Sequence, residues 1–467
     1  MVFSSLLFLG IFLPLVLLFY NFSKNLKYRN IILVISSLVF YAWGEPKLVI
    51  LLVLTAFLGY VAGLVIQIGN KNGKGWMRKA ALSGAVIVSL GSLGVFKYSG
   101  FVVENISALI GKDINFVGFA LPLGISFYTF QILTYIIDLY RNEIKVQKSF
   151  LDFLAYVTMF PQLVAGPIVR YIDIEKELYS RKVRAKDFEY GTLRFCQGLL
   201  KKVILANSAG EIADRLLMGD LSKASVATAW LGIILYTFQI YFDFSGYSDM
   251  AIGMGKFFGF NFMENFNYPY ISKSITDFWR RWHISLSTFF RDYVYIPLGG
   301  NRKRHIFNIF VVWMLTGLWH GASWNFIFWG VFYGVLLIIE KKAFGGKLMK
   351  LPAWLGHMYT MVIVICGWAL FYFTDFSKLK SFFKCAFGLY GNSLVDFTAK
   401  STFLSNIWLI IVLAVCSTPL LRVAYRKLCK IKYIGNVVPA LIVAVSLFVC
   451  FALLVGQSYN AFLYFRF

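Results

Sequence analysis

The sequence contains little charge, little histidine and no paired cysteine. Charged residues occupy 15% of the 467 positions, whereas hydrophobic residues occupy 59% and the mean hydropathy is +0.69. A soluble fold of this length could not bury so much apolar surface, so most of that surface must face lipid. The absence of any CxxC pair excludes a disulfide framework and a cysteine-based metal cluster; the six cysteines are scattered at Cys196, Cys366, Cys385, Cys416, Cys429 and Cys450.

Several catalytic motifs are also missing. The chain has no Walker loop, no GxSxG elbow and no dinucleotide fingerprint after a strand. Its four histidines show neither HxxxH nor HExxH spacing, so we expect no metal site. No internal repeat, low-complexity tract or soluble domain is visible. The sequence therefore predicts one integral-membrane domain over residues 1–467.

Basic residues are in large excess, with 46 lysines and arginines against 22 acidic residues. On a soluble protein a net charge of +24 would suggest nucleic acid as a partner. Here the cations concentrate in short loops between apolar runs, such as 71–79 and 425–432, as is typical of cytoplasmic loops. We therefore expect membrane lipid as a partner and no nucleic acid, with the amino terminus outside and the first basic loop in the cytoplasm.

Long apolar runs dominate what remains. Segment 151–169 contains Pro161 and Pro167, which favour a re-entrant hairpin, and segment 191–218 is amphipathic. The pattern predicts an all-α polytopic membrane protein with about 11–13 membrane-embedded helices, re-entrant segments included. Runs of spanning length lie at about 5–21, 30–43, 48–68, 80–98, 116–138, 228–245, 306–319, 322–340, 357–374, 403–424 and 437–456.

A polar, aromatic segment, "KSITDFWRRWHISLSTFFRDYVYIPLGGNRKR", occupies residues 273–304. If its first half is one helix, Asp277 and Arg281 form an ion pair four residues apart, and Trp279 and His283 share another face. Ionisable residues beside a membrane are costly and usually paired or functional. An interfacial helix with aromatic anchors would explain most of these residues without any catalytic role.

A histidine stands inside an apolar stretch at "TGLWHGASWNF", residues 316–326. A neutral imidazole in hydrocarbon costs several kcal/mol, so His320 must face protein, water or a substrate. Histidine is the side chain best suited to proton transfer near neutral pH. Two interpretations stay open: a proton-transfer residue supported by neighbours such as Trp319 and Asn325, or a structural histidine that caps a helix.

Two carboxylates interrupt another apolar run at "YTFQIYFDFSGYSDMAIGMG", residues 236–255. Asp243 and Asp249 could orient a catalytic histidine, pair with Arg280 or Arg281, or cap a helix. The structural roles are favoured. Nearby glycines would let helices pack closely.

Taken together, the motifs resemble a known family. "DFWRRWHISLSTFFRDYVYIPLGGNR" followed by "VWMLTGLWHGASWNFIFWG" is similar to the membrane-bound O-acyltransferase family, in the branch that contains the membrane subunit of alginate O-acetylation. Shorter matches follow in the same order along the chain, at "YAWGEP", "LPLGISFYTFQ", "FPQLVAGPI", "YFDFSGYSDMAIG" and the closing "FLYFRF".

The resemblance implies a helical bundle around a funnel or tunnel, with His320 as the catalytic histidine and His283 at the second polar position of the family's motif pair. It implies no permanently bound cofactor. The acyl donor would be a cytoplasmic thioester such as acetyl-CoA, and the acceptor a polysaccharide hydroxyl beyond a bacterial cytoplasmic (inner) membrane. In this branch an extracytoplasmic acetyltransferase-like or acyl-carrier partner often completes the transfer.

The chemistry is compatible with these residues. A hydroxyl is a poor nucleophile at neutral pH, so His320 could take its proton as a base, which contributes a factor of roughly 10² to 10⁴, or could act as a nucleophile; the sequence leaves both roles open. His283 could orient it or stabilise the oxyanion. The positive-inside rule explains the nearby cations as well as donor binding does, but four of them could hold the donor's phosphates: Arg280, Arg281, Arg302 and Lys303.

Two other classes of function remain. A proton-coupled transporter or flippase would use His320 as a relay, but the missing repeat and the scarce intramembrane acids count against it. A membrane scaffold would need no histidine chemistry.

Overall fold

The computed structural model describes the whole chain except residues 165, 345–351, 432–433, 457–458, 461 and 464–467. Throughout this described part the regular structure is helical, with no strand. The all-α fold class is therefore confirmed. Contacts divide the chain into two compact units, with boundaries inside helix α9, inside helix α11 and in the segment between Met263 and Glu264. The expectation of one domain over 1–467 stays a prediction.

Unit 1 comprises Met1–Phe195 and Tyr247–Met263. It includes the first part of α9 (Ala185–Leu200), the last turns of α11 (Val226–Phe257), and η1 Phe8–Phe12, α1 Leu13–Asn21, α2 Leu26–Ala42, α3 Val49–Lys71, α4 Gly75–Ile110, α5 Ile125–Tyr140, α6 Phe150–Thr158, α7 Phe160–Leu163 and α8 Tyr171–Tyr179.

Unit 2 comprises Cys196–Gly246 and Glu264–Phe467. Besides the remainders of α9 and α11 it contains η2 Lys201–Ala206, α10 Asn207–Leu217, η3 Pro269–Ile271, α12 Ile275–Arg281, α13 Ile284–Phe290, η4 Arg291–Tyr295, α14 His305–His320, α15 Trp324–Ile339, η5 Glu340–Phe344, α16 Ala353–Tyr372, α17 Phe376–Ala386, α18 Phe397–Ser405, α19 Ile407–Cys416, α20 Leu420–Leu428 and α21 Ile434–Gly456.

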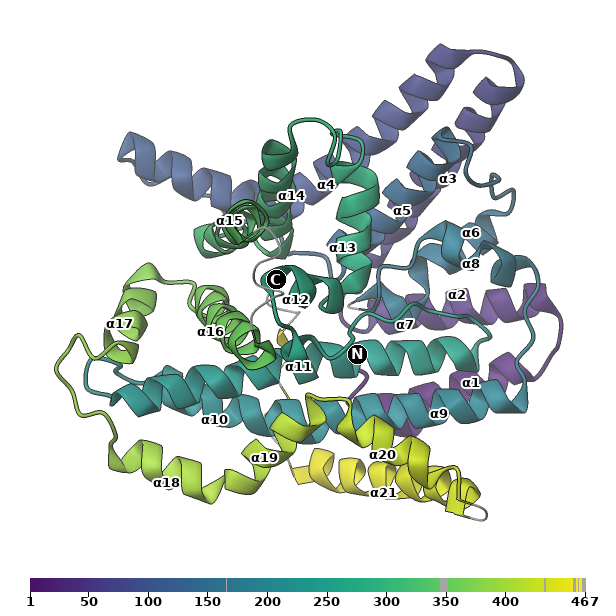
Figure 1. Ribbon diagram of the computed structural model, residues 1–467. Coiled ribbons are helices and arrows are strands. Elements are labelled where there is room, and N and C mark those ends of the chain that lie inside the picture. Colours follow the sequence, from purple (N-terminus) through teal and green to yellow (C-terminus); the bar gives the residue numbers. More distant parts are fainter. Residues whose placement is uncertain (165, 345–351, 432–433, 457–458, 461, 464–467) are drawn as a thin grey trace. The chain divides into compact units, whose positions relative to one another are not determined.

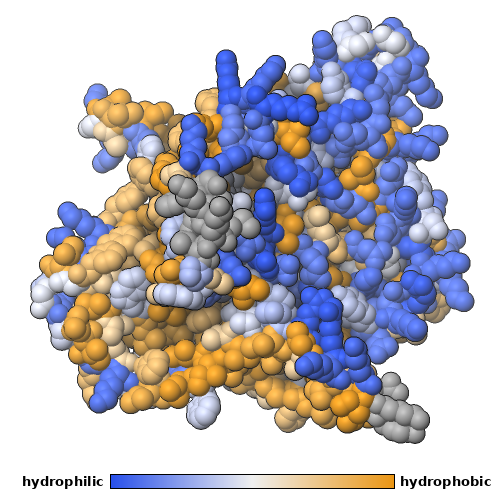
Figure 2. Space-filling model, in the orientation of Figure 1, coloured by the Kyte–Doolittle hydropathy of each residue, from blue (hydrophilic) through white to orange (hydrophobic). Residues whose placement is uncertain are grey.

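Among the described helices, five are long and apolar enough to cross a membrane. The number rises to six if α18 and α19, which meet at 64°, form one broken span. The apolar run at 403–424 is divided among α18, α19 and α20, because the chain leaves the helical conformation after Ser405 and again after Cys416 (Figure 1). In the orientation of Figure 2, hydrophobic residues gather over α19, whereas the loop that precedes α14 is hydrophilic.

The segment predicted as a re-entrant hairpin is interrupted where its prolines stand. Helix α6 ends at Thr158, Met159 adopts an extended ψ of 111°, and Pro161 lies in the first turn of α7. The amide of Phe160 donates to Ser37 Oγ at 3.0 Å, so the break leaves that buried N–H satisfied. The interruption is confirmed, and re-entry into one side of the membrane stays a prediction.

Helices α14 and α15 form a tight antiparallel hairpin in unit 2 (Figure 1). Gly317 and Gly330 allow this approach. A Cβ atom on Gly317 would overlap the carbonyl oxygen of Phe326, and one on Gly330 would overlap that of Trp313. Small residues at such crossings let helix backbones pack closely in membranes. The hairpin brings the end of α14, with His320, against the aromatic core of unit 2.

Candidate active site

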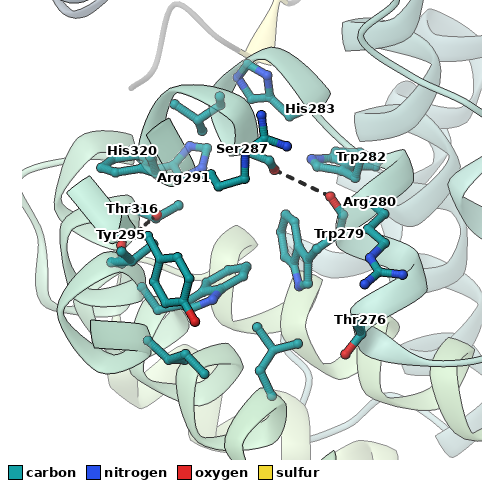
Figure 3. Close-up of a pocket in the computed structure, with 16 residues that line it drawn as sticks. Thr276, Trp279, Arg280, Trp282, His283, Ser287, Arg291, Tyr295, Thr316 and His320 are labelled. Atoms are coloured by element: carbon teal, nitrogen blue, oxygen red, sulfur yellow. Dashed lines mark hydrogen bonds between the residues drawn. The ribbon is translucent and has the colours of Figure 1, made fainter. Parts of the chain in front are cut away.

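A cavity of about 260 Å³ lies within unit 2 (Figure 3). Its wall combines two separate parts of the chain, the α12–η4 segment and the α14–α15 hairpin. Both histidines singled out from the sequence belong to this wall. The lining residues are Thr276, Trp279, Arg280, Trp282, His283, Leu286, Ser287, Phe290, Arg291, Tyr295, Ile309, Val312, Trp313, Thr316, His320 and Leu337.

His320 is the last residue of α14 and is only 5% exposed. Aromatic rings surround it, with centroids 4.9 Å away for Trp319, 5.0 Å for Trp329 and 5.2 Å for Phe371. The next residue is glycine because a Cβ at Gly321 would overlap the ring of Phe326. This packing holds the imidazole in one place beside the cavity.

The cavity follows one face of α14. Its lining residues on this helix are separated by three, one, three and four positions, which is the spacing of a single helical stripe. The stripe begins one turn inside the helix and ends at His320, a distance of about 16 Å at 1.5 Å per residue. It consists of Ile309, Val312, Trp313, Thr316 and His320. The cavity therefore extends from near the basic loop 301–304 to the histidines.

His283 occupies an unusual backbone position. Its φ of 45° and ψ of 56° place it in the left-handed region, where it serves as N-cap of α13. Helix α12 has already ended at Arg281, so the prediction that Trp279 and His283 share one helical face is wrong. The imidazole, 2% exposed, packs against Phe244 at 4.7 Å and Trp319 at 5.7 Å between centroids.

A buried amide contacts the second histidine. Asn265, which is fully buried, has its Oδ1 atom 3.2 Å from His283 Nδ1, 3.1 Å from the amide nitrogen of Ser285 and 2.9 Å from Ser285 Oγ. Burial lowers the pKa of His283 to about 3. The imidazole is therefore neutral at physiological pH.

Helix α12 is held at its start by a buried carboxylate. Glu340, 6% exposed, accepts hydrogen bonds from the amides of Ile275 at 2.6 Å and Thr276 at 2.9 Å, and from Thr276 Oγ1 at 2.7 Å. A negative charge is favourable at a helix N-terminus. Glu340 follows α15 directly, so it links the hairpin that carries His320 to the segment that carries His283.

The four cations proposed for donor phosphates have different surroundings. Arg280 lines the cavity, whereas Arg281 forms the predicted ion pair with Asp277, with Nε 2.9 Å from Oδ1. Arg302 and Lys303 are exposed in the loop before α14 and are absent from the cavity lining. A further guanidinium in the lining, that of Arg291, was not selected from the sequence.

Asp243 and Asp249 lie inside α11, far from either end, so neither caps the helix. Asp243 Oδ1 lies 2.7 Å from Lys202 Nζ, with both side chains 2% exposed. Asp249 pairs with Arg194 in unit 1, also at 2.7 Å. Both carboxylates therefore form ion pairs, in agreement with the structural roles favoured from the sequence. Their partners are Lys202 and Arg194, whereas the sequence suggested Arg280 or Arg281.

The other two supporting residues are buried beside His320. Trp319 contacts the rings of both histidines. Asn325 is fully buried and its Nδ2 donates to the carbonyl of Leu370 at 3.3 Å, which ties the start of α15 to α16. Among the described residues, no group of three or more His, Cys, Asp or Glu side chains is placed to hold a metal ion.

Comparison with known proteins identifies the family of this chain. The sequence model of the membrane-bound O-acyltransferase family matches residues 112–383, more than half of the chain, and the match includes every residue that lines the cavity. The chain belongs to this family. It is a membrane protein and an O-acyltransferase.

Relatives with different named activities agree with this assignment. A probable alginate O-acetylase of Azotobacter vinelandii is 44% identical over 378 residues, covering 79% of this chain and 75% of the relative. A peptidoglycan O-acetyltransferase of Helicobacter pylori is 34% identical, covering 87% and 84%. A teichoic acid D-alanyltransferase of Bacillus subtilis is 32% identical over a shorter region, 52% of this chain and 64% of the relative.

Sequence reasoning missed several residues that line or support the cavity. Asn265 lies 18 residues from His283 and 20 residues from Ser285, and Glu340 lies 64 residues from Thr276, so these contacts leave no local signal in the sequence. Thr316 could have been found from the sequence, because it lies four residues before His320 on the same helix face. Tyr295, which also lines the cavity, had no such signal.

Proposed function

We propose that this acyltransferase uses His320 to move an acyl group, above all acetyl, from a cytoplasmic thioester such as acetyl-CoA to a hydroxyl. The acceptor is a hydroxyl of an exported polysaccharide, reached through an extracytoplasmic acetyltransferase-like or acyl-carrier partner protein. The membrane is the bacterial cytoplasmic membrane. One observation carries the proposal: two histidines from separate segments line the same cavity, which follows α14 away from a basic loop.

The cavity supports a thioester donor that enters from the basic end. The loop 301–304 precedes α14, and cations in short loops are typical of the cytoplasmic side. A long thioester could lie along the stripe on α14, with its acyl carbon near His320. Arg280 and Arg291 offer guanidinium groups for the anionic part of such a donor.

His320 would act as general base. It takes the proton of the attacking hydroxyl while that oxygen bonds to the acyl carbon; the C–S bond then breaks, and the thiolate recovers the proton from the imidazolium. The products are an ester and a free thiol, so no other reactant is required. His283 would serve as its polar partner in the same cavity.

The relatives support the choice of acceptor. Their names give alginate and peptidoglycan O-acetylation and teichoic acid D-alanylation, all of them modifications of polymers with hydroxyl groups. A hydroxyl of an exported polysaccharide is the acceptor class that two of these activities share.

Thiol release from acetyl-CoA by the purified protein in nanodiscs, with its acceptor hydroxyl supplied, tests the proposal. We expect His320→Ala to abolish release while the protein still melts cooperatively. His357→Ala is the matched control, because His357 does not line the cavity. Wild-type release by His320→Ala would show that the catalytic assignment is wrong, and movement of an envelope precursor without thiol release would favour the transporter.

A further inference from the structure

The two segments that carry His283 and Asn265 are hydrogen-bonded to each other through their backbones. Two such bonds pair the segments. Ile284 N donates to Asn265 O at 3.0 Å, and Asn267 N donates to Arg281 O at 2.9 Å. His283 also holds a left-handed conformation that is strained for a residue other than glycine. Such strain persists only where the surroundings determine the conformation.

The orientation of the Asn265 carboxamide follows from its partners. A backbone N–H is always a donor, so the Asn265 atom that faces the Ser285 amide at 3.1 Å is the oxygen. The Ser285 hydroxyl donates to the same oxygen at 2.9 Å. Asn265 Oδ1 therefore acts as an acceptor toward every group that it contacts here.

The protonation of His283 follows in turn. Its Nδ1 lies 3.2 Å from this oxygen, which carries lone pairs and no hydrogen, and 3.4 Å from Ser285 Oγ, whose proton is donated to Asn265, so Nδ1 carries the proton. A neutral imidazole has one N–H, which leaves the lone pair on Nε2. While neutral, His283 can accept a proton or a hydrogen bond at Nε2 and cannot donate one there.

We propose that Asn265 is a positioning residue that holds His283 in the Nδ1–H tautomer, so that Nε2 serves as a hydrogen-bond acceptor in acyl transfer. The inference rests on the proposed function of the cavity. It assigns His283 a different task from the oxyanion donor considered from the sequence, because a neutral ring in this tautomer offers no N–H at Nε2.

The groups around His283 determine how a substitution at position 265 would change the pH dependence of the reaction. Phe244 of α11 and Trp319 of α14, which pack against its ring, carry no charge. The titratable or charged side chains that share the cavity are Arg280 of α12, Arg291 and Tyr295 of η4, and His320 of α14. A carboxylate placed at position 265 would add the anion nearest to His283 Nδ1 and would raise the basicity of the ring.

Two substitutions at Asn265 test the proposal in the thiol-release assay. Asn265→Asp keeps an oxygen acceptor, so we expect activity within about tenfold of wild type and an acidic limb of the pH–rate profile moved to higher pH. Asn265→Ala removes the acceptor and should lower kcat by about 100-fold or more, with KM for acetyl-CoA little changed. Asn406→Ala is the control, because Asn406 does not line the cavity.

Equal and severe losses in Asn265→Asp and Asn265→Ala, with both proteins folded, would overturn the inference, as would wild-type kcat in Asn265→Ala. The result is separable from the proposed function, which fails if His320→Ala keeps the wild-type rate. Should the Asn265 variants not fold, nitrogen-15 NMR of wild-type protein labelled at histidine decides. A protonated Nδ1 and an unprotonated Nε2 on His283, assigned by loss of the signal in His283→Gln, support the inference; the opposite tautomer overturns it.

Discussion

Gly317 of α14 and Gly330 of α15 lie back to back, so that a Cβ atom on Gly330 would come within 3.1 Å of the Gly317 Cα. The same Cβ would overlap the carbonyl oxygen of Trp313. All of its closest neighbours are backbone atoms, which cannot rotate away as a side chain does. The crossing of the two helices, and with it the position of His320, depends on these two residues having no side chain.

We therefore expect Gly330→Ala to destabilise the protein by about 1–3 kcal/mol, the usual cost of overpacking. The measurement is the melting temperature in detergent, together with the rate of thiol release. Gly94→Ala is the matched control, because nothing lies within 4 Å of a Cβ at that position of α4 and alanine is the better helix former. An unchanged melting temperature for Gly330→Ala would contradict the packing described here.

The ion pair between Lys202 and Asp243 supports a second prediction. Both side chains are 2% exposed and the charged atoms are 2.7 Å apart. Asp243 Oδ2 also accepts the amide of Leu463 at 2.8 Å, so the carboxylate anchors residues near the carboxyl terminus. Removing one buried partner leaves the other charge uncompensated, which typically costs about 3–5 kcal/mol.

Lys202→Met should accordingly lower stability by this amount, and Lys202→Met combined with Asp243→Leu should restore much of it. Chemical or thermal unfolding in detergent measures both. The exposed pair of Arg215 and Glu211 is the comparison, and Arg215→Met should have almost no effect. Additive losses in the double variant would argue against a direct interaction.

The histidines show how far sequence reasoning reaches at this site. His320 could be selected because an imidazole in an apolar run must have a polar or chemical reason to be there. Its position at the end of α14 follows from the helical run predicted at 306–319. The apolar periodicity was equally sufficient for the all-α class.

Other parts of the site depend on contacts between residues far apart in the chain. Asn265 precedes His283 by 18 residues, and Glu340 follows Thr276 by 64. Nothing near His283 signals its left-handed backbone, because tryptophan and histidine give no turn signature. A continuous helix was the natural expectation from spacing alone. The tertiary hydrogen bonds to Asn265 favour the break.

The lowered pKa of His283 leads to a prediction about pH and stability. Burial reduces the pKa from 6.5 in the unfolded chain to about 3 in the folded protein. Between these values the unfolded state binds a proton that the folded state refuses, so stability falls as pH drops below about 6.5. The melting temperature of wild type should therefore fall more steeply between pH 7 and pH 5 than that of His283→Gln. Parallel slopes for the two proteins would show that His283 does not contribute.

Arg280 and Arg281 are adjacent, yet only the first lines the cavity. Arg281 instead holds Asp277, in a pair whose side chains are about one-third exposed, at 30% and 35%. If Arg280 contacts the phosphates of the donor, Arg280→Ala should raise KM for acetyl-CoA by roughly 10- to 150-fold, since a charge-assisted hydrogen bond contributes about 1.5–3 kcal/mol. Salt should weaken donor binding less in this variant than in wild type.

Arg281→Ala provides the control at the neighbouring position, with the same change in net charge. Exposed pairs contribute little, so this variant should keep the wild-type KM and nearly the wild-type melting temperature. Initial rates of thiol release over a range of acetyl-CoA concentrations separate KM from kcat for both proteins. Equal increases in KM would mean that the net charge of the segment attracts the donor, whereas an increase confined to Arg280→Ala would indicate a contact made from the cavity wall.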